Sequence, residues 1–99
     1  MDFIKPLQEG FTIYSKSGCP NCMKIKNLLI KNKLQFTIIN CDEYLLENKT
    51  EFLFFIREHS KVECKTFPII FHNGIFISSF TEAEKLIEKL CLFSFDENF

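Results

Sequence analysis

Apolar patterning marks four segments of the chain as strands. Residues 11–15 alternate between apolar and polar side chains, as expected for a strand with one buried face. Residues 35–41 are rich in β-forming residues and contain a continuous apolar stretch, which is typical of a buried parallel strand. Residues 67–71 and 75–79 flank an Asn-Gly pair at 73–74, which is a strong signal for a two-residue hairpin turn.

Helical spacing of apolar residues marks three further segments. The first runs from residue 20 to about 33, where the apolar side chains share one broad face and lysines point away. The second begins at the capping sequence N-x-x-E of Asn48 and ends near residue 59. The third begins at Thr81-x-x-Glu84 and carries apolar residues at i, i+3, i+4 and i+7 up to Leu90.

These segments follow one another in the order β-α-β-α-β-β-α, which predicts an α/β domain with a four-stranded mixed sheet flanked by helices. Two strands joined through a helix should be parallel, and the final hairpin should add an antiparallel edge. A chain of 99 residues fits a single domain, 1–99, with its core over about 11–91. We expect residues 92–99 to be a frayed tail; an apolar flap is the alternative.

Composition and charge narrow the possible function classes only in part. The formal net charge of -1 gives no reason to expect nucleic acid, so the lysines of the first helix region are interpreted as a solvated face. Asp42, Glu43 and Glu47 are interpreted as a solvated acidic loop. No run approaches the roughly 18 apolar residues of a membrane span, and no secretory signal is recognised. We therefore expect a cytoplasmic protein whose five cysteines are reactive or buried thiols.

A Cys-Pro-Asn-Cys sequence at 19–22 is the feature that points to chemistry. It lies between the first predicted strand and the first predicted helix. At a helix start, free backbone N–H groups and the positive end of the helix dipole favour a thiolate, and Lys16 adds positive charge. Cys22 is close enough in the sequence to close a disulfide with Cys19. We predict Cys19 as the nucleophile and Cys22 as the more buried resolving thiol.

Zinc binding is the rival use of such a cysteine pair. A structural zinc site needs two further ligands at matched spacing, and the chain has no second C-x-x-C and no H-x-x-x-H, so no metal is expected. Cys41 and Cys91 are interpreted as packing residues. Cys64 precedes Pro68 by four residues, and whether it approaches the active face stays open.

Pro68 heads a predicted strand, where a residue that cannot donate to the sheet is tolerated. It is either a simple edge-strand proline or a cis proline beside the reactive sulfur. The order of elements favours the cis form, because it places this loop opposite the loop of Cys19. The backbone of Phe67 would then be free to pair with an extended thiol substrate.

Three motifs in order resemble the glutaredoxin family of thioredoxin-fold proteins, over about residues 11–90. Residues 14–22 (Y-S-K-S-G-C-P-N-C) resemble the family's strand, lysine and C-P-Y-C motif. Residues 65–68 (K-T-F-P) resemble its basic-T-V-P segment, and residues 77–82 (I-S-S-F-T-E) occupy the place of its I-G-G-x-[ST]-[DE] segment. The absence of W-C-G-P-C argues against a thioredoxin proper, and the second cysteine argues against the C-G-F-S monothiol class.

The resemblance implies that glutathione lies across this face. By matching position, Lys16 and Lys65 would meet its glycine carboxylate, and the backbone of Phe67 would pair with its cysteinyl unit. The N–H groups near Thr81, with the side chain of Glu82, would hold its γ-glutamyl end.

The remaining residues of the implied glutathione site are Asn21, Thr66 and Pro68. Asn21 stands where the family usually has an aromatic Tyr, which removes one flank of the groove. Ser-Ser at 78–79 replaces Gly-Gly, which changes how closely the backbone allows a ligand to approach. We expect glutathione to bind more weakly than in relatives with C-P-Y-C and Gly-Gly.

The resemblance thus implies a monomeric dithiol oxidoreductase with glutathione as reductant. Cys19 would attack a protein disulfide or a glutathione mixed disulfide, and Cys22 would displace the product. Ribonucleotide reductase is among the substrates that the family suggests. The alternatives are a redoxin reduced by a flavoprotein reductase, an iron–sulfur-binding dimer that uses Cys19 and glutathione, and a scaffold that keeps the fold.

Overall fold

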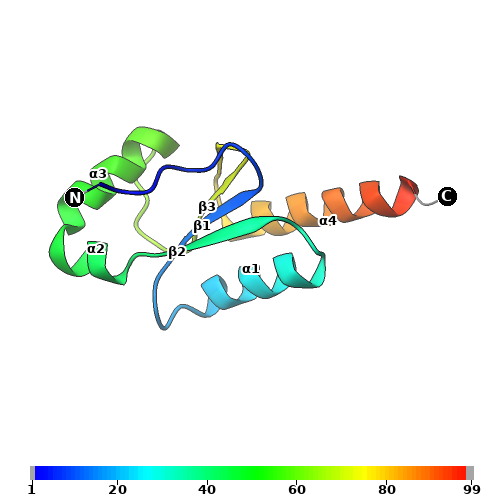
Figure 1. Ribbon diagram of the computed structural model, residues 1–99, viewed down its shortest axis with the longest axis horizontal. Helices are drawn as coiled ribbons and strands as arrows, with labels where there is room; N and C mark the ends of the chain where they lie inside the picture. The colour runs from blue at the N-terminus through cyan, green and yellow to red at the C-terminus, as the bar shows by residue number, and fades with distance from the viewer. Residues whose placement is uncertain (1, 98–99) are drawn as a thin grey trace.

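A four-stranded sheet with the strand order β2-β1-β3-β4 organises the chain. The computed structural model describes the backbone of residues 2–97 and the side chains of residues 2–91. Along the chain the elements are β1 (Phe11–Ser15), α1 (Pro20–Lys31), β2 (Phe36–Asn40), α2 (Asp42–Glu47), α3 (Lys49–Ser60), β3 (Ile69–His72), β4 (Ile75–Ile77) and α4 (Phe80–Glu97) (Figure 1). The predicted strands and the predicted mixed sheet are confirmed.

Strand directions follow from the connections. β1 and β2 are parallel and in register from Phe11 opposite Phe36 to Ser15 opposite Asn40, as expected for a pair joined through α1. β3 is antiparallel to β1, and β4 is antiparallel to β3. Asn73 and Gly74 both have positive φ, 51° and 82°, which is what a tight two-residue hairpin turn requires.

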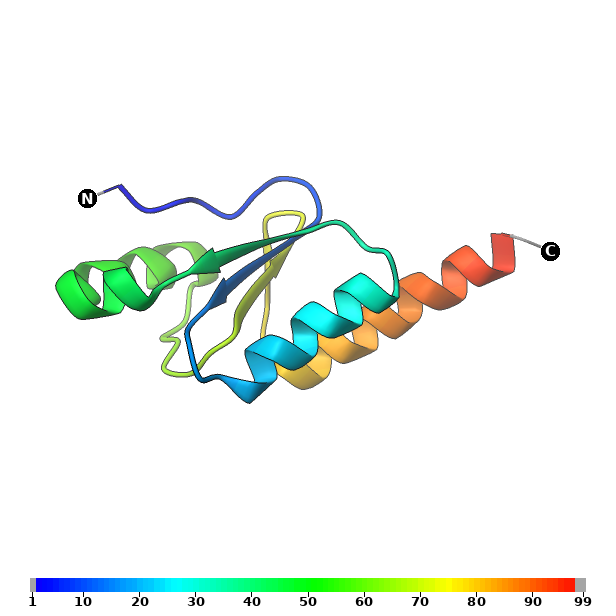
Figure 2. The same cartoon turned by 60° about the horizontal axis from the view of Figure 1, so that its bottom comes forward.

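The two faces of the sheet bury different sets of side chains. Helices α1 and α4 lie side by side on one face (Figure 2), where Ile25 and Leu29 of α1 and Ile87 of α4 pack with Phe11 and Ile13. Helix α3 covers the other face with a cluster built on Tyr14, Phe52, Ile56 and Phe71. β1 is buried along its whole length, so it forms the centre of the core.

Two predictions about the helices were wrong. The acidic segment expected to be a solvated loop forms α2 (Asp42–Glu47), a short helix whose first turn carries Asp42 and Glu43, where the helix dipole favours carboxylates. The segment expected to be a frayed tail continues α4 to Glu97, because residues 90–97 contain no Gly or Pro to interrupt a helix already formed. Residues 98–99 lie outside the described part of the chain.

The start of α4 also differs from the prediction. Thr81 was expected to cap this helix, but α4 begins at Phe80 and Thr81 lies within its first turn. The hydroxyl of Ser79 instead accepts a hydrogen bond from the N–H of Glu82, at 3.2 Å. Ser79 is therefore the residue that satisfies an unpaired N–H of the first turn.

The N-terminal residues pack against the sheet rather than standing apart. The hydroxyl of Tyr14 donates to the carbonyl of Ile4 at 2.6 Å, and burial raises the pKa of Tyr14. Phe3 contacts Tyr44 and Phe52 edge-on. Of the helices in residues 2–97, none is long and apolar enough to cross a membrane.

Candidate active site

The first cysteine lies at the end of the loop that connects β1 to α1. Cys19 is the N-cap residue of α1, with an extended backbone (φ -104°, ψ 105°), and Pro20 follows in the first turn, where its missing N–H costs no hydrogen bond. The Sγ atom of Cys19 accepts a hydrogen bond from the N–H of Cys22, at 3.2 Å. Gly18, just before it, has φ +72°, a conformation that side chains rarely adopt.

The second cysteine is buried like the first, and burial raises its pKa. Cys22 is 6% exposed and Cys19 is 9% exposed, so both are reached through narrow openings. Burial, together with a hydrogen bond involving Cys19, raises the pKa of Cys22 to about 12. Cys22 is therefore held mainly as a thiol at neutral pH.

A carboxylate that the sequence analysis set aside holds the loop before Cys19. The N–H of Ser17 donates to Asp42 Oδ1 at 2.9 Å, and the hydroxyl of Ser17 donates to the other oxygen of the same carboxylate. These hydrogen bonds lower the pKa of Asp42, the hydroxyl contributing most. The backbone N–H of Asp42 donates a hydrogen bond to Oδ1 of Asn40, at 2.9 Å. It thus ties the start of α2 to the redox loop.

Only the position of Asp42 along the chain points to its role in holding the loop before Cys19. Asp42 is two residues beyond β2 and therefore at the same sheet edge as Ser17, which is two residues beyond the parallel strand β1. Such a pairing needs the register of the two strands, which the sequence alone does not supply.

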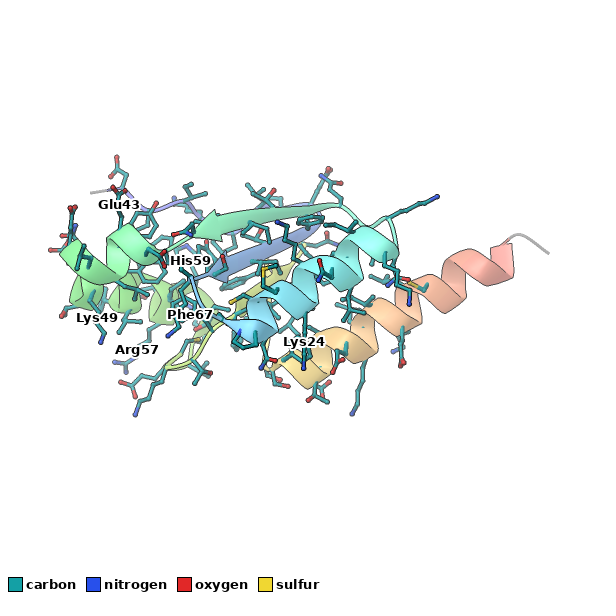
Figure 3. All side chains as sticks on the ribbon, turned by 90° about the horizontal axis from the view of Figure 1, so that it is seen from below. Lys24, Glu43, Lys49, Arg57, His59 and Phe67 are labelled. Atoms are coloured by element: carbon teal, nitrogen blue, oxygen red, sulfur yellow. The ribbon has the colours of Figure 1, made fainter. Side chains whose placement is uncertain are left out.

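The loop before β3 lies against Cys19 from the other side. The Phe67–Pro68 peptide bond is cis, as predicted. The thiol of Cys19 donates to the carbonyl oxygen of Phe67, with sulfur and oxygen 3.5 Å apart. The ammonium of Lys16 lies 5.7 Å from the centre of the Phe67 ring, and Figure 3 shows Phe67 beside the start of α1.

A groove of about 400 Å³ runs from this contact along β4. It gathers five of the residues predicted to bind glutathione, namely Asn21, Lys65, Thr66, Phe67 and Pro68. Ser78 and Ser79 line it as well, which confirms that the residues replacing Gly-Gly face the groove. Cys64 also lines it, which answers the question left open for that residue.

The two predicted residues of α4 lie further along. Glu82 lines a second hollow that shares Phe76, Ile77 and Ser78 with the groove, and it forms an exposed ion pair with Lys85 at 3.7 Å. Thr81 lines neither hollow among the described residues. Lys16 reaches the groove only through its contact with the Phe67 ring.

The other cysteines separate by environment. Cys41 is completely buried at the start of α2, its Sγ lies 3.4 Å from the carbonyl of Ile39, and burial raises its pKa to about 12. Cys64 is half-buried and near the hydroxyl of Ser60, at 3.6 Å. Cys91 packs against the α1–α4 core. Within the described side chains, no group of three metal-ligating residues comes together.

These features define a class. A parallel β1–β2 pair, an antiparallel hairpin, a C-x-x-C at the start of α1 and a cis proline beside the first sulfur together make a thioredoxin-like α/β protein with a dithiol centre. Comparison with known proteins narrows this class to one family.

The model of the glutaredoxin family matches residues 11–77, and the chain belongs to this family. Glutaredoxin-2 of Schizosaccharomyces pombe is 32% identical over 75 residues, which cover 76% of this chain and 64% of that protein. The chain thus matches a little less than two thirds of that relative's length.

Solved structures agree with the family. The crystal structure of glutaredoxin 1 from Francisella tularensis superposes with a TM-score of 0.68 at 26% identity, covering 81% of this chain and 93% of that one. The solution structure of a dithiolic glutaredoxin from Trypanosoma brucei brucei gives a TM-score of 0.64 at 26% identity, with 85% and 82% covered.

Proposed function

We propose that the protein is a dithiol thiol–disulfide oxidoreductase that reduces protein disulfides or glutathione mixed disulfides and is itself reduced by glutathione. The observation that carries the proposal is the placement of one sulfur. The Sγ of Cys19 lies between the N–H of Cys22 and the carbonyl of Phe67, at the start of α1. A substrate sulfur that approaches it meets a helix N-terminus and the backbone of Phe67 together.

The reaction has two exchange steps. The Cys19 thiolate attacks one sulfur of a substrate disulfide, the S–S bond breaks, and the departing thiolate takes a proton from water. Cys22 then loses its proton and attacks Cys19, which releases the second substrate thiol and leaves a Cys19–Cys22 disulfide. Two molecules of glutathione restore the dithiol and leave as glutathione disulfide, so the two electrons balance.

Charge and backbone support glutathione as the ligand of the groove. Lys65 lines the groove and Lys16 contacts the Phe67 ring at its border, and both are suitable partners for the glycine carboxylate. The backbone of Phe67 suits the cysteinyl unit, and Glu82 suits the amino group of the γ-glutamyl end, beyond Ser78. The missing aromatic at Asn21 favours weak binding.

The partners and location belong to the same proposal. A glutathione-dependent reductase needs a compartment with a reducing glutathione pool, so we propose that the protein acts in the cytoplasm. Disulfide-containing proteins, ribonucleotide reductase among them, are the proposed substrates, and we propose that the protein acts as a monomer.

The test compares two electron sources. Purified protein is given a peptide–glutathione mixed disulfide, with glutathione and glutathione reductase in one assay and with a thioredoxin reductase in the other. We expect turnover with glutathione only. Turnover with the flavoprotein alone would contradict glutathione as reductant and favour the flavoprotein-reduced redoxin. The departures at Asn21 and residues 78–79 from the family pattern would then explain why glutathione is not used.

A trapping variant tests the order of the two sulfurs. Cys22→Ser should accumulate a mixed disulfide at Cys19, seen by mass spectrometry as an added glutathione on that residue, because no second thiol displaces it. Cys19→Ser should accumulate none. A trapped adduct on Cys22 of the Cys19→Ser protein, at a similar rate, would reverse the assignment.

A further inference from the structure

The two redox cysteines line a cavity on the side of β1 opposite the groove. In the sheet, β2 and β3 flank β1 on opposite sides. The groove lies on the β3–β4 side and is lined by neither redox cysteine. A smaller cavity of about 220 Å³ lies on the β2 side, and both Cys19 and Cys22 line it. Both cysteines therefore line a cavity on a side that the proposed glutathione groove leaves free.

The lining of this second cavity is cationic. Lys16 and Lys26 are among its lining residues, and none of the lining residues is acidic. Among the described side chains, neither lysine forms an ion pair within 4.0 Å. Asp42 interacts with Lys16 by charge and accepts hydrogen bonds from Ser17, but it lines no part of the cavity. Lys26 therefore carries the uncompensated charge.

Lys26 is also placed on the correct face of α1. It follows Cys22 by four residues, and residues four apart on a helix lie above one another. Met23, which also lines the cavity, is 57% exposed and offers a flexible apolar surface at the rim. One cavity is thus lined by a lysine, Lys26, an exposed apolar side chain, Met23, and the two redox cysteines.

We propose that this cavity binds an acidic side chain next to the disulfide of a protein substrate, with Lys26 as the residue that selects for it. The inference rests on the proposed function, because it concerns the substrate of the same sulfur. A whole small molecule is a poorer occupant, since ligand pockets usually span about 300–1,000 Å³. One side chain of a larger partner suits a shallow cavity with an exposed rim.

The expected consequence is selectivity in the rate of encounter. A carboxylate near the substrate disulfide is attracted to Lys26 and Lys16, which brings the disulfide to Cys19 from the β2 side. Such surface charges act mainly on association and weaken with salt. The charged groups around the pair are then Lys16, Lys26 and Asp42.

The experiment uses two synthetic peptides that each contain one disulfide and differ only in flanking residues, Glu-Glu or Gln-Gln. The ratio of their kcat/KM values is measured with glutathione and glutathione reductase, for wild type, Lys26→Glu and Lys24→Glu. Lys24 is the matched control, because it lies on the same helix but lines a different hollow with Glu84 (Figure 3).

We expect wild type to prefer the acidic peptide by about fivefold at low ionic strength, as one or two exposed charge pairs allow. Lys26→Glu should lower that ratio to about one or below, and Lys24→Glu should keep it within about twofold of wild type. Adding salt to about 0.5 M should remove the preference.

Two results would overturn the inference. Equal ratios for wild type and Lys26→Glu would show that the cavity does not select acidic substrates. An equal loss of the preference in Lys24→Glu would show that the preference comes from the overall positive charge of α1 and not from a specific site. Failure of the proposed function looks different, because neither peptide, nor a simple glutathione mixed disulfide, would then be reduced by any of the three proteins.

Discussion

Two cysteines of this chain occupy the same kind of position, and only one of them is suited to chemistry. Cys19 follows β1 and is the N-cap residue of α1, while Cys41 follows β2 and is the N-cap residue of α2. Because β1 and β2 are parallel and in register, both caps lie at the same edge of the sheet. Comparing the two cysteines shows which features, besides position at a helix start, distinguish a thiol that a substrate can reach from one that only packs.

The differences are in backbone, helix length and access. Cys19 has an extended cap conformation, ψ 105°, which turns its sulfur toward the N–H of Cys22. Cys41 has ψ 7°, and its side chain makes no cap hydrogen bond. α1 has 12 residues and α2 has six. Cys41 is fully buried, so no substrate sulfur reaches it in the folded state.

The largest expected effect follows from replacing each cap cysteine in turn. Cys19→Ser should lower disulfide reduction by at least about a thousandfold, because the attacking sulfur is gone. Cys41→Ser should retain most of the activity in the same glutathione-coupled assay. A Cys41→Ser protein as inactive as Cys19→Ser, yet folded by circular dichroism, would break the comparison.

Alkylation should separate the same thiols by rate. Burial raises the pKa of both Cys22 and Cys41 to about 12, so both are held mainly as thiols near pH 8. We expect iodoacetamide to modify Cys19 well ahead of both, as followed by peptide mass mapping of native protein. Similar rates at Cys19 and Cys41 would mean that the N-cap geometry gives no advantage.

The burial of Cys41 also predicts a pH dependence of stability. A thiol whose pKa is raised on folding stabilises the protein fully below its unfolded pKa of about 8.5. That contribution is lost as pH rises from there toward about 12. The free energy of unfolding, measured with urea, should therefore fall with pH above about 8.5, and less steeply in Cys41→Val. An identical slope in both proteins would contradict the burial of this thiol.

Asp42 links the two caps, and removing it should affect both. Asp42→Ala should lower the melting temperature and the rate of disulfide reduction, because Ser17 loses the acceptor of two hydrogen bonds. Its pKa is lowered on folding, so this contribution is present above about pH 4 and is lost as pH falls below it. Glu43→Ala is the control, since Glu43 lies on α2 away from the redox loop (Figure 3). Equal changes in melting temperature and rate for the two variants would contradict the role of Asp42 in holding the redox loop.

The smallest effect concerns the residue two positions after each cap. Asn21 lines the groove, whereas Glu43, its counterpart after Cys41, does not. Asn21→Tyr adds an apolar flank that contributes on the order of 1 kcal/mol, so glutathione should bind about fivefold more tightly. The titration is best followed by NMR in the Cys22→Ser background, which avoids disulfide closure. Unchanged affinity would indicate that the ligand does not contact this side of the groove.

The sequence predicted most of what local rules determine. The strand segments, the C-x-x-C at a helix start and the cis bond at Pro68 each depend on neighbours along the chain or on the order of elements. The sequence did not reveal the pairing of Ser17 with Asp42, which depends on the register of β1 and β2. Likewise, Thr81 and Ser79 are equally good capping residues by type, and the end of β4 at Ile77 decides between them.

The hairpin that ends at Ile77 has a consequence for how the molecule behaves in a crowded solution. β4 and β2 are the two edge strands of the sheet, and Ile75 on β4 is 69% exposed. A long apolar edge would invite strands from other molecules to add to the sheet. β4 has only three residues, so it presents few unpaired peptide groups to a neighbour. The short strand thus offers a neighbouring chain little to pair with at this edge, and the residues just beyond Ile77 line the groove.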